Sequence, residues 1–188
     1  MKFIRLLARK IITTILSNLK FERFNKEGWH GFKDTSQDLA LYKKALIKTD
    51  NVDSDNLHKQ SRFLDLINVT RDLLNKNYLD DFVEVGCWRG HSSYILSELI
   101  QKSHHNLNLH IFDSFEGLSK PEEEDLEGST NPVSGGEMSP SFEHIQNLFP
   151  TSIVQKCWIP NQLKHTDALF DFVHIDVDLY DPILGSLE

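Results

Sequence analysis

Between residues 82 and 92 the chain reads FVEVGCWRGHS. An apolar strand pattern runs to Glu84, a turn containing Gly86 and Gly90 follows, and a helical pattern opens near Ser92. Glycine lets a backbone approach a ligand closely, and ligands of parallel sheets sit beyond the carboxyl ends of the strands. We therefore expect a binding site at this turn, with the glutamate facing a positively charged group of the ligand.

Three further apolar runs resemble the one that enters this turn. Together they predict four buried parallel strands, at residues 81–85, 109–112, 152–155 and 170–175. Helical patterns separate or precede them, at residues 58–75, 92–100 and 142–149, the last with Ser141 as a plausible N-cap. Alternation of strands and helices indicates an α/β fold with a parallel, Rossmann-like sheet.

Composition restricts the classes of function. A length of 188 residues suits one domain, and 39% hydrophobic residues are enough for a buried core. The net charge of −8 argues against nonspecific nucleic-acid binding, which needs a basic surface. Cys87 and Cys157 are too few for a disulfide scaffold and form no metal-type cluster, so we expect a cytoplasmic protein with reduced thiols.

The N-terminal region differs from the rest. Residues 1–21 carry five cations and no acid, with apolar residues at helical spacing and no run long enough to span a bilayer. Such a helix can lie on the inner membrane surface, pack on its own domain or pack on a second subunit, and these alternatives stay open. We expect residues 22–57 to be a loosely structured lead-in with a short helix at 42–47, so that residues 58–188 form the main domain.

Residues 119–138 are rich in glycine, proline and acidic side chains. This composition buries little surface and predicts a mobile loop. A loop of this length in a compact domain is often an active-site lid, although an acidic run is more often a solvated face.

Acidic residues end two more predicted strands. Asp113 follows the second strand, 27 residues after Gly86, and a carboxylate there can accept hydrogen bonds from a ribose diol. Asp176 and Asp178 follow the fourth strand, and their oxygens suit a hard cation such as Mg²⁺. The alternatives are a solvated turn aspartate for Asp113 and capping or loop-bracing roles for the other two.

Three segments in this order resemble the macrocin O-methyltransferase family: DFVEVGCWRG at 81–90, DSFEGL at 113–118 and HIDVDLY at 174–180. The resemblance runs from about residue 58 to the end of the chain. It implies a class I methyltransferase fold and transfer of a methyl group from S-adenosylmethionine to a sugar hydroxyl of a glycoside or glycan. It also implies a seven-stranded sheet, of which the chain contains only four strands. We therefore expect a sheet truncated after the fourth strand, and an inactive fragment when the chain is made as it stands.

The resemblance assigns cofactor roles by position. It implies that the methionine part is held by Glu84, Gly86 and Gly90, to which we add Ser92 at the start of the helix. It implies that Asp113 binds the ribose and that Ser114, Phe115 and Trp158 lie near the adenosine. Cys157 stands where the family usually has glycine, which is a departure next to the expected adenine pocket.

The resemblance also implies a catalytic pair, with Asp176 as a Mg²⁺ ligand and Asp178 as the general base. A sugar hydroxyl is almost fully protonated at neutral pH, so a metal and a base would both help it to react. Three other readings stay open: a metal-dependent glycosyltransferase with an Asp-x-Asp motif, a nucleotide-binding dehydrogenase, and a non-enzymatic half-fold that binds a partner. The missing third glycine of GxGxxG disfavours the dehydrogenase.

Overall fold

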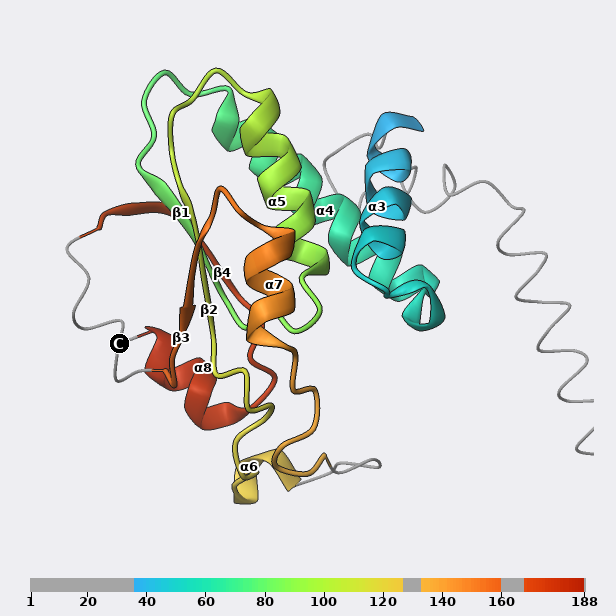
Figure 1. Cartoon of the computed structure of the whole chain (residues 1–188), viewed down its shortest axis with the longest axis vertical. Coiled ribbons are helices and arrows are strands. Elements are labelled where there is room, and N and C mark those ends of the chain that lie inside the picture. Colours follow the sequence, from blue (N-terminus) through green and yellow to red (C-terminus); the bar gives the residue numbers. More distant parts are fainter. Residues whose placement is uncertain (1–35, 127–132, 160–167, 188) are drawn as a thin grey trace, which may run out of the picture.

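The computed structural model describes residues 36–126, 133–159 and 168–187. The basic helix predicted at residues 1–21 lies outside these residues. Within them, four parallel strands form one sheet in the order β3-β2-β1-β4 (Figure 1). The strands are β1 (Asp81–Val85), β2 (Leu109–Asp113), β3 (Ile153–Lys156) and β4 (Phe170–Ile175). The parallel α/β fold expected from the sequence is thereby confirmed.

The strand order reverses beside β1. The chain proceeds from β1 to β2 and β3 on one side, and it then returns to place β4 on the other side of β1. Such a reversal leaves a crevice at the carboxyl ends of the strands, because the connections on its two sides leave in opposite directions. The turn after β1 therefore stands at the position where this class of sheet binds ligands.

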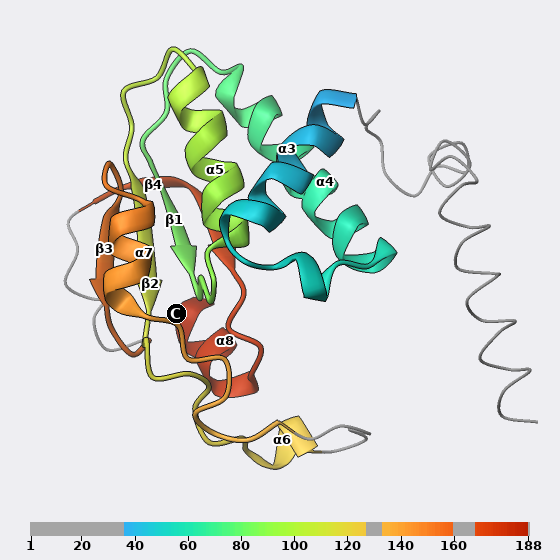
Figure 2. The same cartoon turned by 45° about the vertical axis from the view of Figure 1, so that its right-hand side comes forward.

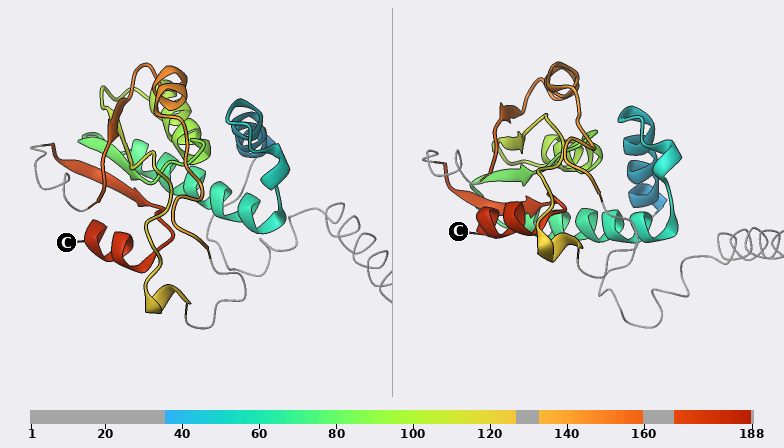
Figure 3. Two further views of the ribbon diagram at one scale, coloured as in Figure 1. Left: turned by 60° about the horizontal axis from the view of Figure 1, so that its bottom comes forward. Right: turned by 90° about the horizontal axis from the view of Figure 1, so that it is seen from below.

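Helices lie on both sides of the sheet. Two of them, α5 (His91–Lys102) and α7 (Phe142–Leu148), lie on one side, and α8 (Tyr180–Leu187) lies on the other (Figure 3). The Ser141 side chain accepts a hydrogen bond from the His144 backbone amide, which confirms it as the N-cap of α7.

The segment before residue 58 is more ordered than the sequence suggested. Residues expected as a lead-in form α3 (Ser36–Lys48) and a short 3₁₀ turn, η1 (Val52–Ser54), before α4 (Leu57–Leu74) (Figure 2). The apolar side of α3 packs against α4 and α5 in a core that contains Tyr42, Phe63, Leu64, Ile67 and Ile95. The short helix expected at residues 42–47 is the second half of α3.

The long acidic loop also contains local structure. Residues Glu123–Leu126 form the short helix α6, and the backbones of Leu118 and Glu137 are joined by a hydrogen bond of 2.8 Å. The base of the loop is thus closed on itself. Residues 127–132 at its centre lie outside the described residues.

The strands differ in how far they are covered. Every residue of β1 and β2 is buried except one at an end of each strand, whereas β3 and β4 carry exposed residues such as Ile153 and Val173. The expectation of four fully buried strands is wrong for this pair, because β3 and β4 are the edges of the described sheet.

In residues 36–126, 133–159 and 168–187, no helix is both long enough and apolar enough to cross a membrane.

Candidate functional site

A pocket of about 300 Å³ opens at the carboxyl ends of the strands. Its walls come from the segments that follow β1, β2, β3 and β4, from the start of α4 and α5, and from the base of the acidic loop. Sequence-distant segments thus meet at one edge of the sheet, as the parallel topology requires.

Gly86 forms part of the pocket wall where β1 ends. Its φ is +84°, and a Cβ atom on it would lie 2.4 Å from the Asp176 carbonyl oxygen. Only glycine can bring the two strand ends this close, because any side chain would collide with the backbone of the residue after β4. Trp88, two residues later, also adopts a positive φ, of 45°.

Asp113 binds the turn after β1. Its Oδ2 accepts hydrogen bonds from the backbone amides of Cys87 and Trp88, at 2.9 and 3.1 Å. Its Oδ1 accepts one from the Phe115 amide at 2.8 Å. A carboxylate offers about four acceptor positions, so these bonds leave room for about one ribose hydroxyl rather than two.

Glu84 lies beneath the pocket and is fully buried. One carboxylate oxygen accepts a hydrogen bond from the Ser93 hydroxyl, and the other lies 3.0 Å from Nδ1 of His174. Burial alone would lower the pKa of His174, but the hydrogen bond and charge of Glu84 outweigh it and raise that pKa. Glu84 is not in the pocket wall, and its expected contact with the cofactor stays a prediction.

Two other predicted cofactor residues also lie outside the pocket wall. Gly90 has a φ of +81°, and a Cβ there would lie 2.8 Å from the ring of Phe149, the residue that follows α7. Phe115 is 7% exposed and packs edge to face on Phe142, with ring centroids 5.0 Å apart. Both residues hold α7 against the sheet in this structure, and their contact with a ligand stays a prediction.

The side of the pocket next to β3 is the expected adenine end. Ser114, Cys157 and Trp158 all line it. The indole nitrogen of Trp158 donates a hydrogen bond to Glu116, at 3.2 Å. Burial and the nearby Asp113 raise the pKa of the Cys157 thiol to about 11, so Cys157 is a neutral wall residue at physiological pH.

The side of the pocket next to β4 is acidic. Asp176 and Asp178 both line the pocket, and Asp178 adopts a positive φ of 62°. Burial and the charge of Asp176 raise the pKa of Asp178. The guanidinium of Arg62 lies 3.7 Å from Asp176.

These carboxylates are donors of the right kind for Mg²⁺. That ion is usually bound by one or two carboxylates and keeps several waters. Mutual repulsion of the two charges also favours a cation between them. No cluster of three or more metal-binding side chains occurs within the part of the chain that the structure describes.

The start of α4 contributes pocket residues that the sequence did not single out. Asn56, His58, Lys59 and Arg62 line the pocket together with His91 of α5. Burial and the charge of Lys59 hold the pKa of His91 at about 4, so its ring is neutral. The sequence signal for these pocket residues was weak, because Lys59 and Arg62 stand three residues apart on a helix whose apolar pattern indicated only core packing.

Seven of the ten predicted site residues meet in this one pocket: Gly86, Ser92, Asp113, Ser114, Trp158, Asp176 and Asp178. They come from the ends of all four strands and from the start of α5. The three exceptions, Glu84, Gly90 and Phe115, lie directly behind its walls, in contact with neighbouring elements.

Comparison with known proteins gives the family. The sequence model of the family described as "Macrocin-O-methyltransferase (TylF)" matches residues 9–188, nearly the whole chain. The chain therefore belongs to this family. No curated protein shows significant sequence similarity to it.

Two solved structures share the fold. The O-methyltransferase NovP aligns with a TM-score of 0.54 and 18% identity over 65% of this chain. The calicheamicin methyltransferase CalS11 aligns with a TM-score of 0.57 and 14% identity over 83% of this chain. The match spans 55% of the NovP chain and 73% of the CalS11 chain.

Proposed function

We propose that this protein takes part in methyl transfer from S-adenosylmethionine to a hydroxyl of a sugar on a small-molecule glycoside or a glycan, with Mg²⁺ as a second cofactor. The observation that carries the proposal is the convergence of Gly86, Asp113 and the pair Asp176 and Asp178 on one pocket in a member of this family. Separate strand ends supply these groups, and each has a chemical task in such a reaction.

The two sides of the pocket suit the two ends of the cofactor. On the β2 and β3 side, Asp113 has one free acceptor position for a ribose hydroxyl, and Trp158 offers a flat apolar surface to a base. On the β1 side, the backbone at Gly86 can approach a ligand without a side chain in between. When bound, S-adenosylmethionine supplies an electrophilic methyl group on a sulfonium.

The acidic side supplies the base. The hydroxyl must lose its proton as its oxygen forms the new bond to carbon, and Asp178 is the candidate to accept it. A raised pKa brings this carboxyl closer to neutral pH, which improves a general base. Asp176 would hold Mg²⁺ near the acceptor, where the ion would lower the pKa of a bound hydroxyl.

Methyl transfer by the full-length protein, with labelled cofactor and a panel of sugars and glycosides, tests the proposal. Asp178→Asn should lower the rate about 10²–10⁴-fold, the usual contribution of a general base. Asp176→Asn and treatment with EDTA should also lower it, and added Mg²⁺ should restore only the EDTA-treated protein. Asp181→Asn, an exposed carboxylate outside the pocket wall, is the matched control and should keep the wild-type rate.

The outcomes separate the parts of the proposal. Full activity in EDTA would remove Mg²⁺ and leave Asp178 as a base acting alone. Sugar transfer from a nucleotide sugar, without methyl transfer, would favour the glycosyltransferase reading instead.

A further inference from the structure

The start of α4 places a cation in the pocket wall without an acidic partner. Nζ of Lys59 donates a hydrogen bond to the Ser54 hydroxyl at 2.6 Å and lies 5.6 Å from the centre of the Trp88 ring. In the described part of the chain, no carboxylate lies within 4.0 Å of it. An ammonium has three donors, so Lys59 keeps donors for a ligand.

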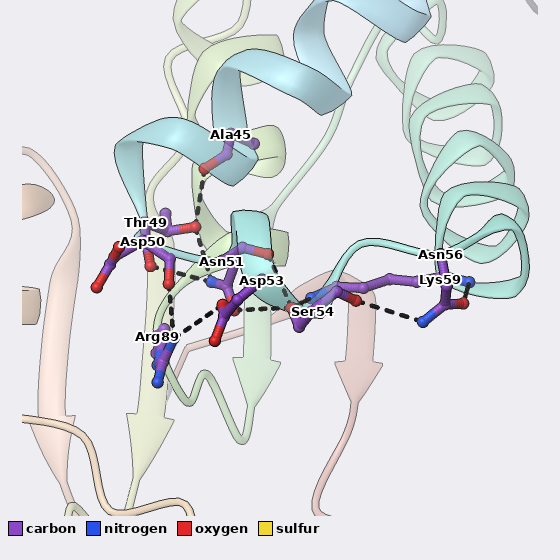
Figure 4. Close-up of polar contacts among 9 residues, drawn as sticks. All are labelled: Ala45, Thr49, Asp50, Asn51, Asp53, Ser54, Asn56, Lys59 and Arg89. Carbon is purple, nitrogen blue, oxygen red and sulfur yellow. Dashed lines mark hydrogen bonds and ion pairs between the residues drawn. The ribbon is translucent and has the colours of Figure 1, made fainter. Parts of the chain in front are cut away.

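A network of polar contacts fixes the position of this ammonium (Figure 4). Arg89, in the turn after β1, donates a hydrogen bond to the Asp50 carbonyl at 2.6 Å and lies 3.6 Å from Asp53. The Ser54 hydroxyl in turn donates to the Asn51 carbonyl at 2.9 Å. The connection between α3 and α4 is thereby tied to the β1–α5 turn, and Ser54 holds Lys59 beside that turn.

The electrostatic surroundings favour an anion here. Burial and the charge of Arg62 lower the pKa of Lys59 more than the charges of Asp55 and Asp53 raise it, so its charged form is only partly compensated in this structure. Arg62 itself is directed at Asp176 on the other side of the pocket. Gly90 caps α5 without a side-chain hydrogen bond, so the first amides of that helix add positive potential near the same turn.

The position of Lys59 in the pocket indicates which anion it would bind. Lys59 lies over Trp88 in the β1–α5 turn, the segment expected to hold the methionine end of the cofactor, whereas Asp113 and Trp158 lie towards β2 and β3. The methionine end carries the only carboxylate of S-adenosylmethionine. We propose that Lys59 is the cation that binds this carboxylate, an inference that rests on the proposed function.

The test uses two ligands that differ only in this group: S-adenosylmethionine and its decarboxylated analogue. Calorimetry should show that Lys59→Met binds S-adenosylmethionine about 10- to 100-fold more weakly, as expected for a hydrogen bond between charged groups. Affinity for the decarboxylated analogue should stay the same in wild type and variant. Lys59→Arg should recover part of the loss, because the positive charge is kept.

Two further variants provide a control and an independent test of the position of the ammonium. Lys43→Met removes an exposed lysine of α3 and should bind both ligands as the wild type does. Ser54→Ala removes the hydrogen bond that positions the ammonium and should cause a smaller loss, again only for S-adenosylmethionine. This second variant answers the question if Lys59→Met does not fold.

The possible outcomes of these binding experiments overturn different parts of the proposal. Equal weakening of both ligands, or no weakening, would overturn the role of Lys59. A raised KM for the acceptor with unchanged cofactor affinity would assign the cation to an anionic acceptor and also overturn it. Wild-type protein that binds neither ligand would instead overturn the proposed function on which the inference rests.

Discussion

The two ends of the pocket contain acidic residues in opposite physical states. Behind the β1 and β2 ends, Glu84 and Asp113 accept hydrogen bonds from hydroxyl or backbone groups, and Glu84 also contacts His174. At the β4 end, Asp176 has one distant cation as partner, and Asp178 is partly desolvated beside a like charge. At one end the acids therefore build the pocket, whereas at the other end they stay available for chemistry.

Removal of the most buried acid should have the largest effect. Glu84→Ala would leave the His174 ring and the Ser93 hydroxyl without their shared partner inside the protein. We expect the free energy of unfolding to fall by about 3–5 kcal/mol, the range for breaking a buried pair by removing one member. Urea unfolding followed by circular dichroism measures this change.

Glu143→Ala is the control for this prediction. Glu143 is exposed on α7, and its removal should change the free energy of unfolding by no more than about 0.5 kcal/mol. A loss for Glu84→Ala as small as the loss for the control would mean that Glu84 does not support the pocket.

The glycine between the two ends should give an intermediate effect. Gly86→Ala places a methyl group 2.4 Å from the Asp176 carbonyl at a φ of +84°, so the β1 and β4 ends must separate. Gly136→Ala has the same strain, at a φ of +85°, but open space around the new methyl group. We expect about 1–2 kcal/mol for the strain alone in Gly136→Ala and a clearly larger loss in Gly86→Ala.

Thermal and urea unfolding of these two variants isolate the cost of the collision. Equal losses would show that the strand ends are not held together at Gly86. Cofactor affinity measured in parallel should fall only in Gly86→Ala, because only that methyl group enters the pocket wall.

The smallest effect should come from the acidic end, with the opposite sign. Asp178→Asn keeps a residue that tolerates positive φ and removes one of two neighbouring charges. Because burial and the Asp176 charge raise the pKa of Asp178 in the folded protein, its ionised form is disfavoured by folding. The stability that the protonated carboxyl contributes is present below the unfolded pKa and is lost as the pH rises through the folded pKa.

Asp178→Asn should therefore unfold at the same or a slightly higher urea concentration at pH 7, and the difference from wild type should shrink near pH 4. Loss of stability at pH 7 would show that Asp178 braces its loop, the structural alternative raised by the sequence. A chemical role is supported when stability is kept and methyl transfer is lost.

Local patterns in the sequence were enough to predict the four strands, and the motifs beside them indicated the family. The runs at residues 81–85 and 170–175 coincide with β1 and β4, and the second and third strands differ from their predicted bounds by one residue. Strand and helix periodicities are local properties, and the turn around Gly86 is local too, so both can be read without knowledge of the partners. The parallel topology then explains why Asp113 and Asp176 were expected at one edge.

The contacts of each polar group, in contrast, follow from the tertiary structure. Glu84 and Asp113 both lie within one residue of a strand end and look alike in the sequence, yet Glu84 is enclosed by Ser93 and His174 while Asp113 reaches the pocket. Lys59 lies about thirty residues before the turn that it approaches, and α3 became recognisable as a core helix only through its packing on α4 and α5. Long-range contacts of this kind depend on which elements share a face, and no local pattern records that choice.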